Sequence, residues 1–429
     1  PAPPELTPRA IILAILLAMI LAAANTYLGL FAGLTIASAI PAAVVSMGVL
    51  KLMGGGHILE NNIVATGASA GSSIAAGVIF TVPALLLLGY WTDFRYSWVF
   101  AIAGLGGLLG VLFSVPLRRS LIVEQKLAFP EGKAAAEVLK SGDKPGEGLK
   151  ILGGAAAIGG LMKLSASSGL RLIPDTAAVS AWFGNTIGYF GTNLSPALFG
   201  VGYIVGLNIG IVMLAGGVIA WNIGIPVYSM FFLSADPILS AELAGATAED
   251  AAYGIWSAQI RYLGVGAMLI GGVWTLVSLR HSLVSGIRSG LAAERNTGDE
   301  VVPPTERDLP MRAIMIGLVL FILPLMFLYQ AIVGQWLVSI PMTIIMIVAG
   351  FLFVSVSAYM AGLVGSSNNP VSGLTIATIL FAALVLVMML GPDSSIGAVA
   401  TIVIGAVVCC AACVGGDNLQ DLKCGYILG

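Results

Sequence analysis

Long apolar segments follow one another along almost the whole chain and leave few choices of fold. A membrane-spanning helix needs roughly 20 mostly apolar residues, and eleven segments approach or exceed that length. They cover residues 10–30, 34–53, 63–89, 97–117, 149–167, 197–221, 253–278, 312–333, 337–361, 371–391 and 394–415. The stretch 197–233 contains either one span plus a half-helix or a tight hairpin. The sequence therefore predicts an all-α, polytopic transmembrane helical bundle.

The composition agrees with this fold class and excludes several functions. Charged residues make up 9% of the chain, whereas soluble domains carry about 25%. A net charge of −2 offers no basic face for nucleic acid, so no nucleic-acid partner is expected. The sequence has no G-x-x-x-x-G-K-[ST] phosphate loop, which argues against an ATP-driven pump. We expect no cofactor.

The few cysteines and histidines argue against a metal centre in the protein itself. Cys409, Cys410 and Cys413 lie in an apolar run, and Cys424 follows. A C-x-x-C pair alone could suggest metal or redox chemistry, but a second pair is missing and the two histidines, His57 and His281, are distant in sequence. We interpret the cysteines as small residues that pack inside a helix bundle.

A short repeat indicates an internal duplication. The hexapeptide Gly33–Ser38 (GLTIAS) returns as Gly373–Thr378 (GLTIAT), and each copy opens an apolar span. Many transporters consist of two such repeats with the binding site between them. We therefore expect a first helical repeat with connecting loops in residues 1–336, and an incomplete second repeat in 337–429. The membrane orientation is left open, because the two most basic loops, 118–148 and 279–311, agree with the positive-inside rule only when an even number of spans separates them.

A polar stripe follows one of the predicted spans. Asn62, Thr66, Ser69 and Ser73 are spaced as one helix face, and polar groups that face lipid are costly. The stripe should face a neighbouring helix or a water-filled cavity. These four residues and Asn61 are our candidate substrate-binding residues, and hydrogen bonding between helices is the alternative.

A second polar segment separates two apolar runs. Asn368 and Asn369 precede Pro370, which breaks a helix because proline has no backbone N–H. A helix that starts after Pro370 would present free N–H groups that can bind a carboxylate. Asn368 and Asn369 are therefore further substrate-binding candidates. An ordinary turn at the membrane surface is the alternative.

A third segment places acids directly after an apolar span. Asp417 and Asp421 share a helix face, and Lys423 is close in sequence. Carboxyl groups at the edge of a membrane cavity can carry protons. We assign proton coupling to Asp417, Asp421 and Glu60, with Asp417 as the first choice. The alternative is a solvated helix end.

Three segments resemble signature stretches of the oligopeptide transporter family. They are Glu60–Phe80, Leu127–Leu139 and Asp417–Gly425, and they are similar to bacterial members related to the plant yellow-stripe-like metal-chelate carriers. The resemblance implies a secondary transporter, typically proton-coupled, for small peptides or metal chelates of peptide-like ligands. It also implies a duplicated bundle of about sixteen helices. By this comparison the chain is truncated in its second repeat.

These observations lead to one functional prediction. We expect a multi-pass protein of the inner (plasma) membrane that carries small oligopeptides by proton-coupled symport. Its partners would be the lipid bilayer, protons and the substrate, and the sequence does not indicate an oligomeric state. A carrier of metal chelates is the alternative within this class. An enzyme is not expected, because no HExxH set is present, and a channel is disfavoured because no charged ring or carbonyl filter is repeated.

Overall fold

The structure is a computed structural model that divides into two compact units. It describes residues 5–32, 35–141, 145–166, 170–174, 176–205, 207–278, 309–367, 369 and 371–429. The first unit comprises residues 1–150 together with 271–429, and the second comprises residues 151–270. We describe each unit by itself.

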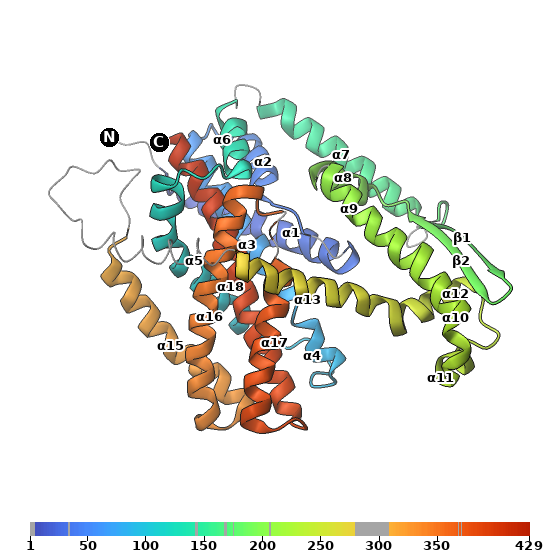
Figure 1. The fold of residues 1–429 in the computed structure, drawn as a ribbon. Helices are drawn as coiled ribbons and strands as arrows, with labels where there is room; N and C mark the ends of the chain where they lie inside the picture. Colours follow the sequence, from blue (N-terminus) through green and yellow to red (C-terminus); the bar gives the residue numbers. More distant parts are fainter. Residues whose placement is uncertain are drawn as a thin grey trace. The chain divides into compact units, whose positions relative to one another are not determined.

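The first unit is a bundle of helices (Figure 1). Its helices are α1 (Pro8–Ala32), α2 (Ala39–Leu52), α3 (Ile58–Ile79), α4 (Pro83–Leu87), α5 (Tyr96–Arg118, extended by a π-helical turn at Arg119–Glu124), α6 (Pro130–Lys140), α15 (Met311–Val333), α16 (Trp336–Val364), α17 (Val371–Leu390) and α18 (Ser395–Leu428). Two further helices cross the division between the units, namely α7 (Pro145–Ser165) and α13 (Arg261–Ser278).

The second unit adds a β-hairpin that the sequence analysis did not predict. Strands β1 (Thr176–Phe183) and β2 (Thr186–Asn193) pair in antiparallel fashion. Gly184 begins the two-residue loop with a φ of 64°, as a type II′ turn requires. The remaining elements are α8 (Pro196–Val205), α9 (Leu207–Gly217), a π-helical turn (Val218–Gly224), α10 (Ile225–Phe231), a 3₁₀ turn (Leu233–Ala235), α11 (Pro237–Glu242), α12 (Ala248–Ile255) and a π-helical turn (Trp256–Ile260) that leads into α13.

The predicted polytopic helical bundle is confirmed, with fewer clear spans than expected. Within the described residues, eight helical stretches are long and apolar enough to cross a membrane: Pro8–Phe31, Ile58–Leu87, Tyr96–Glu124, Gly210–Phe231, Arg312–Val333, Trp336–Val364, Val371–Leu390 and Ser395–Leu428. Three predicted spans are not among them. The first, 34–53, contains only the 14-residue helix α2. The second, 149–167, overlaps α7, and the third, 253–278, is formed by the end of α12, the π-helical turn Trp256–Ile260 and α13.

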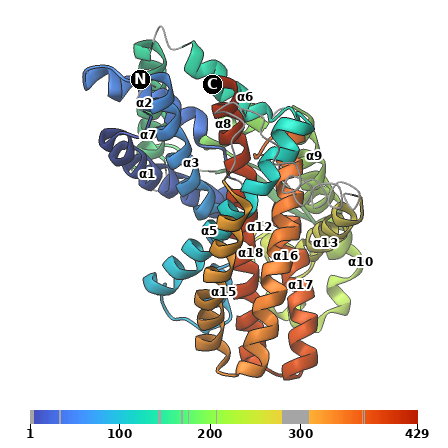
Figure 2. The same ribbon diagram turned by 90° about the vertical axis from the view of Figure 1, so that its left-hand side faces the viewer.

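Helix α18 is the central element of the first unit. In its most apolar window 83% of the residues are buried, against 50% or less in the other candidate spans. It contacts α3, α5, α16 and α17, and both views show α16 and α17 beside it (Figures 1 and 2). Two glycines of α5 permit close packing, since a Cβ atom at Gly106 would lie 2.7 Å from the Val407 carbonyl oxygen and one at Gly110 would lie 2.5 Å from the Ala411 carbonyl oxygen.

Candidate transport site

The predicted polar stripe lies along the contact between α3 and α18. Side chains near the start of α3 meet the end of α18: Asn62 lies beside Gly425. Further along α3, Ser73 donates a hydrogen bond to the Asp417 carboxyl group. Residue numbers therefore rise along one helix as they fall along the other, so the two helices run antiparallel. The stripe is directed at acids of a neighbouring helix.

The four stripe residues have different surroundings. Ser69 and Ser73 are buried, whereas Asn62 and Thr66 are half-buried. The Ser69 hydroxyl lies close enough to the buried Asp421 carboxyl group to interact with it. The Ser73 hydroxyl also lies 2.9 Å from the Ser69 carbonyl oxygen, and its single proton can be donated to only one of these two acceptors at a time. Among the four, Ser73 is the one that lines a cavity.

This cavity has a volume of about 90 Å³ and a mainly polar lining. Its walls are formed by Asn25, Thr35, Ile36, Ala37, Ser73, Ala76, Phe80, Ser366, Ser367, Asn369, Val371, Ser372, Cys413 and Asp417. Such a volume holds several water molecules but is smaller than the roughly 300–1,000 Å³ of typical ligand sites. In this structure the cavity is therefore too small for a peptide, and Asp417 is the acidic residue among the described residues of its lining.

One wall is an extended segment held in place by side chains. The Asn25 amide accepts from the Ile36 N–H and donates to the Ile36 carbonyl oxygen, both at 3.0 Å. Asn25 also donates to Ser72, which accepts a second hydrogen bond from Ser38 at 2.7 Å. These side chains satisfy the backbone in place of helical bonds. The expectation that the first hexapeptide copy opens a span is therefore wrong for its described residues, because α2 begins only at Ala39.

The second hexapeptide copy is helical and lies close to the opposite wall. Helix α17 begins at Val371, two residues before this copy. Directly before the helix, Asn369 lines the cavity and donates to the Ser357 hydroxyl at 2.6 Å. The Ala37 N–H donates to Ser367 at 3.3 Å, which joins the two walls. Asn368 and Pro370 lie outside the described residues.

Glu131, which the sequence analysis did not select, lies beside the two predicted acids. It is the second residue of α6, and its carboxylate accepts from the Ser366 hydroxyl and from the Ser367 N–H. Glu131, Asp417 and Asp421 lie close enough to interact electrostatically. We call these three residues the acidic cluster. In the described part of the chain, no ion pair includes any of them.

Gln420 connects the acidic cluster to the surrounding helices. Its side chain accepts from the Gly132 N–H at 2.8 Å and donates to the Ala361 carbonyl oxygen at 2.6 Å. The start of α6 and the end of α16 are therefore both fixed to α18, next to Asp421. A buried amide with both ends bonded holds these elements in one arrangement.

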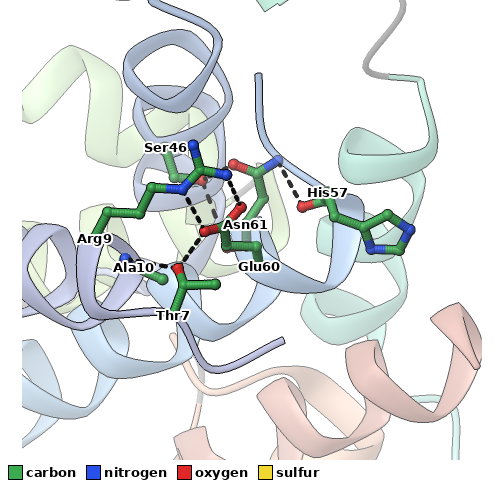
Figure 3. Close-up of polar contacts among 7 residues, drawn as sticks. All are labelled: Thr7, Arg9, Ala10, Ser46, His57, Glu60 and Asn61. Carbon is green, nitrogen blue, oxygen red and sulfur yellow. Dashed lines mark hydrogen bonds and ion pairs between the residues drawn. The ribbon is translucent and has the colours of Figure 1, made fainter. Parts of the chain in front are cut away.

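The structure does not bring Glu60 and Asn61 to the cavity. Figure 3 shows the Glu60 carboxylate beside Thr7 and the Arg9 guanidinium. It accepts hydrogen bonds from the Thr7 hydroxyl and from Nε and Nη2 of Arg9, the last two at 2.7 Å each. Asn61 accepts from Ser46 at 2.9 Å. These contacts join the first three helices to one another, and the Glu60 carboxylate is neutralised by Arg9.

The cysteines have the packing surroundings that the sequence indicated. Cys409, Cys410, Cys413 and Cys424 are free and buried, and within the described residues no group of three or more His, Cys, Asp or Glu side chains could hold a metal ion. Cys413 also forms part of the cavity wall.

Comparisons with known proteins agree with these features. Residues 5–429 match the family described as "OPT oligopeptide transporter protein". A Haemophilus influenzae protein named "Putative oligopeptide transporter" is 35% identical over 422 residues, which cover 94% of this chain and 65% of the relative's length. No solved structure matches the chain. Because the family match extends over nearly the whole sequence, this chain belongs to the oligopeptide transporter (OPT) family.

Proposed function

We propose that this protein is a secondary active transporter that carries small oligopeptides across the inner (plasma) membrane together with protons. Membership of the family and the name of the Haemophilus relative support the substrate class. The observation that carries the proposal is the polar cavity beside the crossing of α3 and α18, with Asp417 in its wall. Transporter sites commonly lie where broken helices from two repeats meet.

The acidic cluster supports proton coupling. Several carboxylates close together in a poorly solvated region repel one another, and within the described residues no cation is paired with them. Protons neutralise such a group without taking up space in a cavity of about 90 Å³. In our proposal, a proton held by this cluster accompanies each transport cycle, and Asp417 exchanges it with the cavity.

The serine hydroxyls connect the cluster to the cavity walls. Ser73 donates to Asp417, and Ser366 donates to Glu131. A change of charge on either carboxyl group would weaken or strengthen these hydrogen bonds, since bonds to charged acceptors are about twice as strong as neutral ones. Proton binding would thus alter how tightly the segment around Ser366 is held, and this segment forms one wall.

The Asp417→Asn substitution tests the proposal, because asparagine cannot release a proton. We expect proteoliposomes with the natural protein to accumulate labelled peptides of two to six residues when a pH gradient is applied. Asp417→Asn should abolish this accumulation while peptide exchange without a gradient persists. Asp393→Asn, which changes an exposed acid between α17 and α18, is the matched control and should behave like the natural protein.

Two outcomes would contradict the proposal. Proton-driven accumulation at the natural rate in Asp417→Asn would remove this residue from coupling. Uptake of metal–nicotianamine-type chelates without any peptide uptake would replace the proposed substrate with the alternative one.

A further inference from the structure

In the β-hairpin of the second unit, the outer edge of β2 has backbone N–H and C=O groups of which only some have hydrogen-bond partners among the described residues. In an antiparallel pair, successive residues turn their N–H and C=O groups alternately toward the partner strand and away from it. On β2 the Ile187 N–H donates to Ser229 at 3.1 Å, and the Tyr189 carbonyl oxygen accepts from Asn222 at 3.0 Å. Both residues therefore face away from β1, and by the same alternation so do Gly191 and Asn193.

The outer groups of Gly191 and Asn193 have no hydrogen-bond partner within the described part of the chain. Ser229 and Asn222 take the place of a third strand beside Ile187 and Tyr189. No other described residue does so beside Gly191 and Asn193. The edge runs beside Gly210–Phe231, a stretch apolar enough to cross a membrane. Open strand edges are not tolerated in hydrocarbon, so these groups need water or another backbone.

A groove lies along this unsatisfied part of the edge. Its volume is about 420 Å³, within the usual range of roughly 300–1,000 Å³ for ligand sites. The opposite wall is one face of α9 and the following turn, formed by Met213, Leu214, Gly217, Val218 and Trp221. A strand edge that faces a helix across a groove is the arrangement in which extended peptides add to a sheet.

Part of the groove wall is aromatic. Tyr189, Trp221 and Tyr253 contact one another with ring centroids 4.8–5.7 Å apart. Burial and the adjacent Tyr253 hydroxyl raise the pKa of Tyr189 above its ordinary value, so its hydroxyl is neutral at physiological pH. Among the described residues, no charged side chain lines this groove. The surface therefore suits an uncharged backbone and an apolar side chain.

We propose that this groove binds a short extended peptide, whose backbone continues the sheet at Gly191 and Asn193 and whose side chain packs on Trp221. Hydrogen bonds to the main chain make such binding tolerant of peptide sequence, and the aromatic wall adds a preference for apolar side chains. The described lining residues carry no charge, so they suit the uncharged interior of a peptide better than its charged termini. The lining residues of this groove are different from those of the cavity at Asp417.

The test uses a capped tripeptide, acetyl-Ala-X-Ala-amide, in which X is the photoreactive residue p-benzoylphenylalanine. Irradiation with the purified full chain in detergent should attach it to residues 189–193 and 213–222, as mapped by mass spectrometry. An analogue methylated on the backbone nitrogen of X cannot donate to the strand. Its cross-linking at equal concentration should fall by about tenfold, the effect of losing one or two hydrogen bonds.

Two proline variants provide a matched pair. Gly191→Pro removes the outward N–H inside the groove, and its Cβ would also lie 2.6 Å from the Tyr189 hydroxyl oxygen, so cross-linking should fall by at least about tenfold. Ala178→Pro removes the equivalent N–H of the register partner on the opposite edge and should leave cross-linking unchanged. Equal labelling by the methylated and unmethylated peptides, or labelling outside the groove, would overturn the proposal. The comparison of the methylated with the unmethylated peptide uses the natural protein, so it tests the proposal even if both proline variants fail to fold.

Discussion

The acids singled out in the sequence fall into two different environments. Asp417 and Asp421 lie together beside the cavity, whereas Glu60 is held by Arg9 and Thr7 near the start of α3. Spacing along a helix could indicate which acids share a face, and this grouped Asp417 with Asp421. It could not indicate that Glu60 has a cation from another helix, because the partner is 51 residues away.

At the residue scale, we predict that Glu60→Gln lowers stability without changing proton coupling. Loss of two charge-assisted hydrogen bonds should reduce the free energy of unfolding by about 1.5–3 kcal/mol, toward the lower end because Arg9 is 35% exposed. Thermal unfolding in detergent and pH-driven peptide accumulation would measure the two effects. Glu124→Gln, which breaks the exposed pair with Arg119, is the control and should change stability by less than about 1 kcal/mol.

The opposite result has a clear meaning. If Glu60→Gln unfolds at the natural temperature but no longer accumulates peptide, then Glu60 belongs to the coupling machinery, as the sequence analysis expected.

Glu131 shows why part of the site was missed. An acid directly after a proline at the start of an amphipathic helix is the ordinary pattern of a helix N-terminus. Its contacts with Ser366 and Ser367 join segments more than 200 positions apart. Its position within the Leu127–Leu139 signature stretch was the one available signal.

At the element scale, the sequence predicted the long spans well and the irregular elements poorly. Apolar length alone identifies α16, α17 and α18. The 34–53 span was wrong because the side chains of Asn25 and Ser72 replace helical hydrogen bonds around residues 36–38. The hairpin was missed although Gly184-Asn185 is a known turn signal, because its two eight-residue strands stand between long apolar runs.

The close packing of α5 against α18 leads to a prediction about the glycines of α5. Gly106→Ala and Gly110→Ala should each destabilise the protein by about 1–3 kcal/mol, because the new methyl groups would overlap the backbone of α18. Gly104→Ala is the matched control: it lies on the same helix with open space around it, so the higher helix propensity of alanine should leave stability unchanged or slightly higher. Thermal unfolding in one detergent compares all three.

A loss of stability in Gly104→Ala equal to the other two would contradict this explanation. It would mean that α5 tolerates no added methyl group on any face, and close approach to α18 would no longer account for the glycines.

At the scale of the whole molecule, the order of helices supports the predicted duplication. Helices α1, α2 and α3 correspond in order to α16, α17 and α18, and in each set the third helix contacts the first two. The first and third helices run parallel in both sets, as the approach of Ala14 to Gly67 and of Ala18 to Gly71 shows for the first. Since α3 and α18 are antiparallel, two such repeats would be inverted with respect to the membrane.

The helix directions also constrain how often the central region crosses the membrane. Helix α5 runs parallel to α18, because Gly106 faces Val407 and Gly110 faces Ala411. Helix α16 is parallel to α18 as well, and α15 precedes it through a link of two residues, 334–335. The end of α5 and the start of α15 therefore lie at the same end of the bundle. Residues 125–310 must then cross an even number of times, so Gly210–Phe231 cannot be their single crossing.

The final prediction follows from this constraint. Single cysteines at Leu52, Ser141 and Leu309, all exposed, should react with a membrane-impermeant maleimide from one side, and cysteines at Asp93 and Asp393 from the other. Five basic residues lie from the last residue of α5 to Ser141, namely Arg118, Arg119, Lys126, Lys133 and Lys140. The positive-inside rule therefore assigns the first side to the cytoplasm. Labelling in intact and in inverted vesicles, in a background without native cysteines, measures this directly. If the cysteine at position 309 reacts from the side opposite to that at position 141, then residues 142–308 cross an odd number of times. The parallel arrangement of α5, α16 and α18 would then be wrong, and with it the inverted repeat.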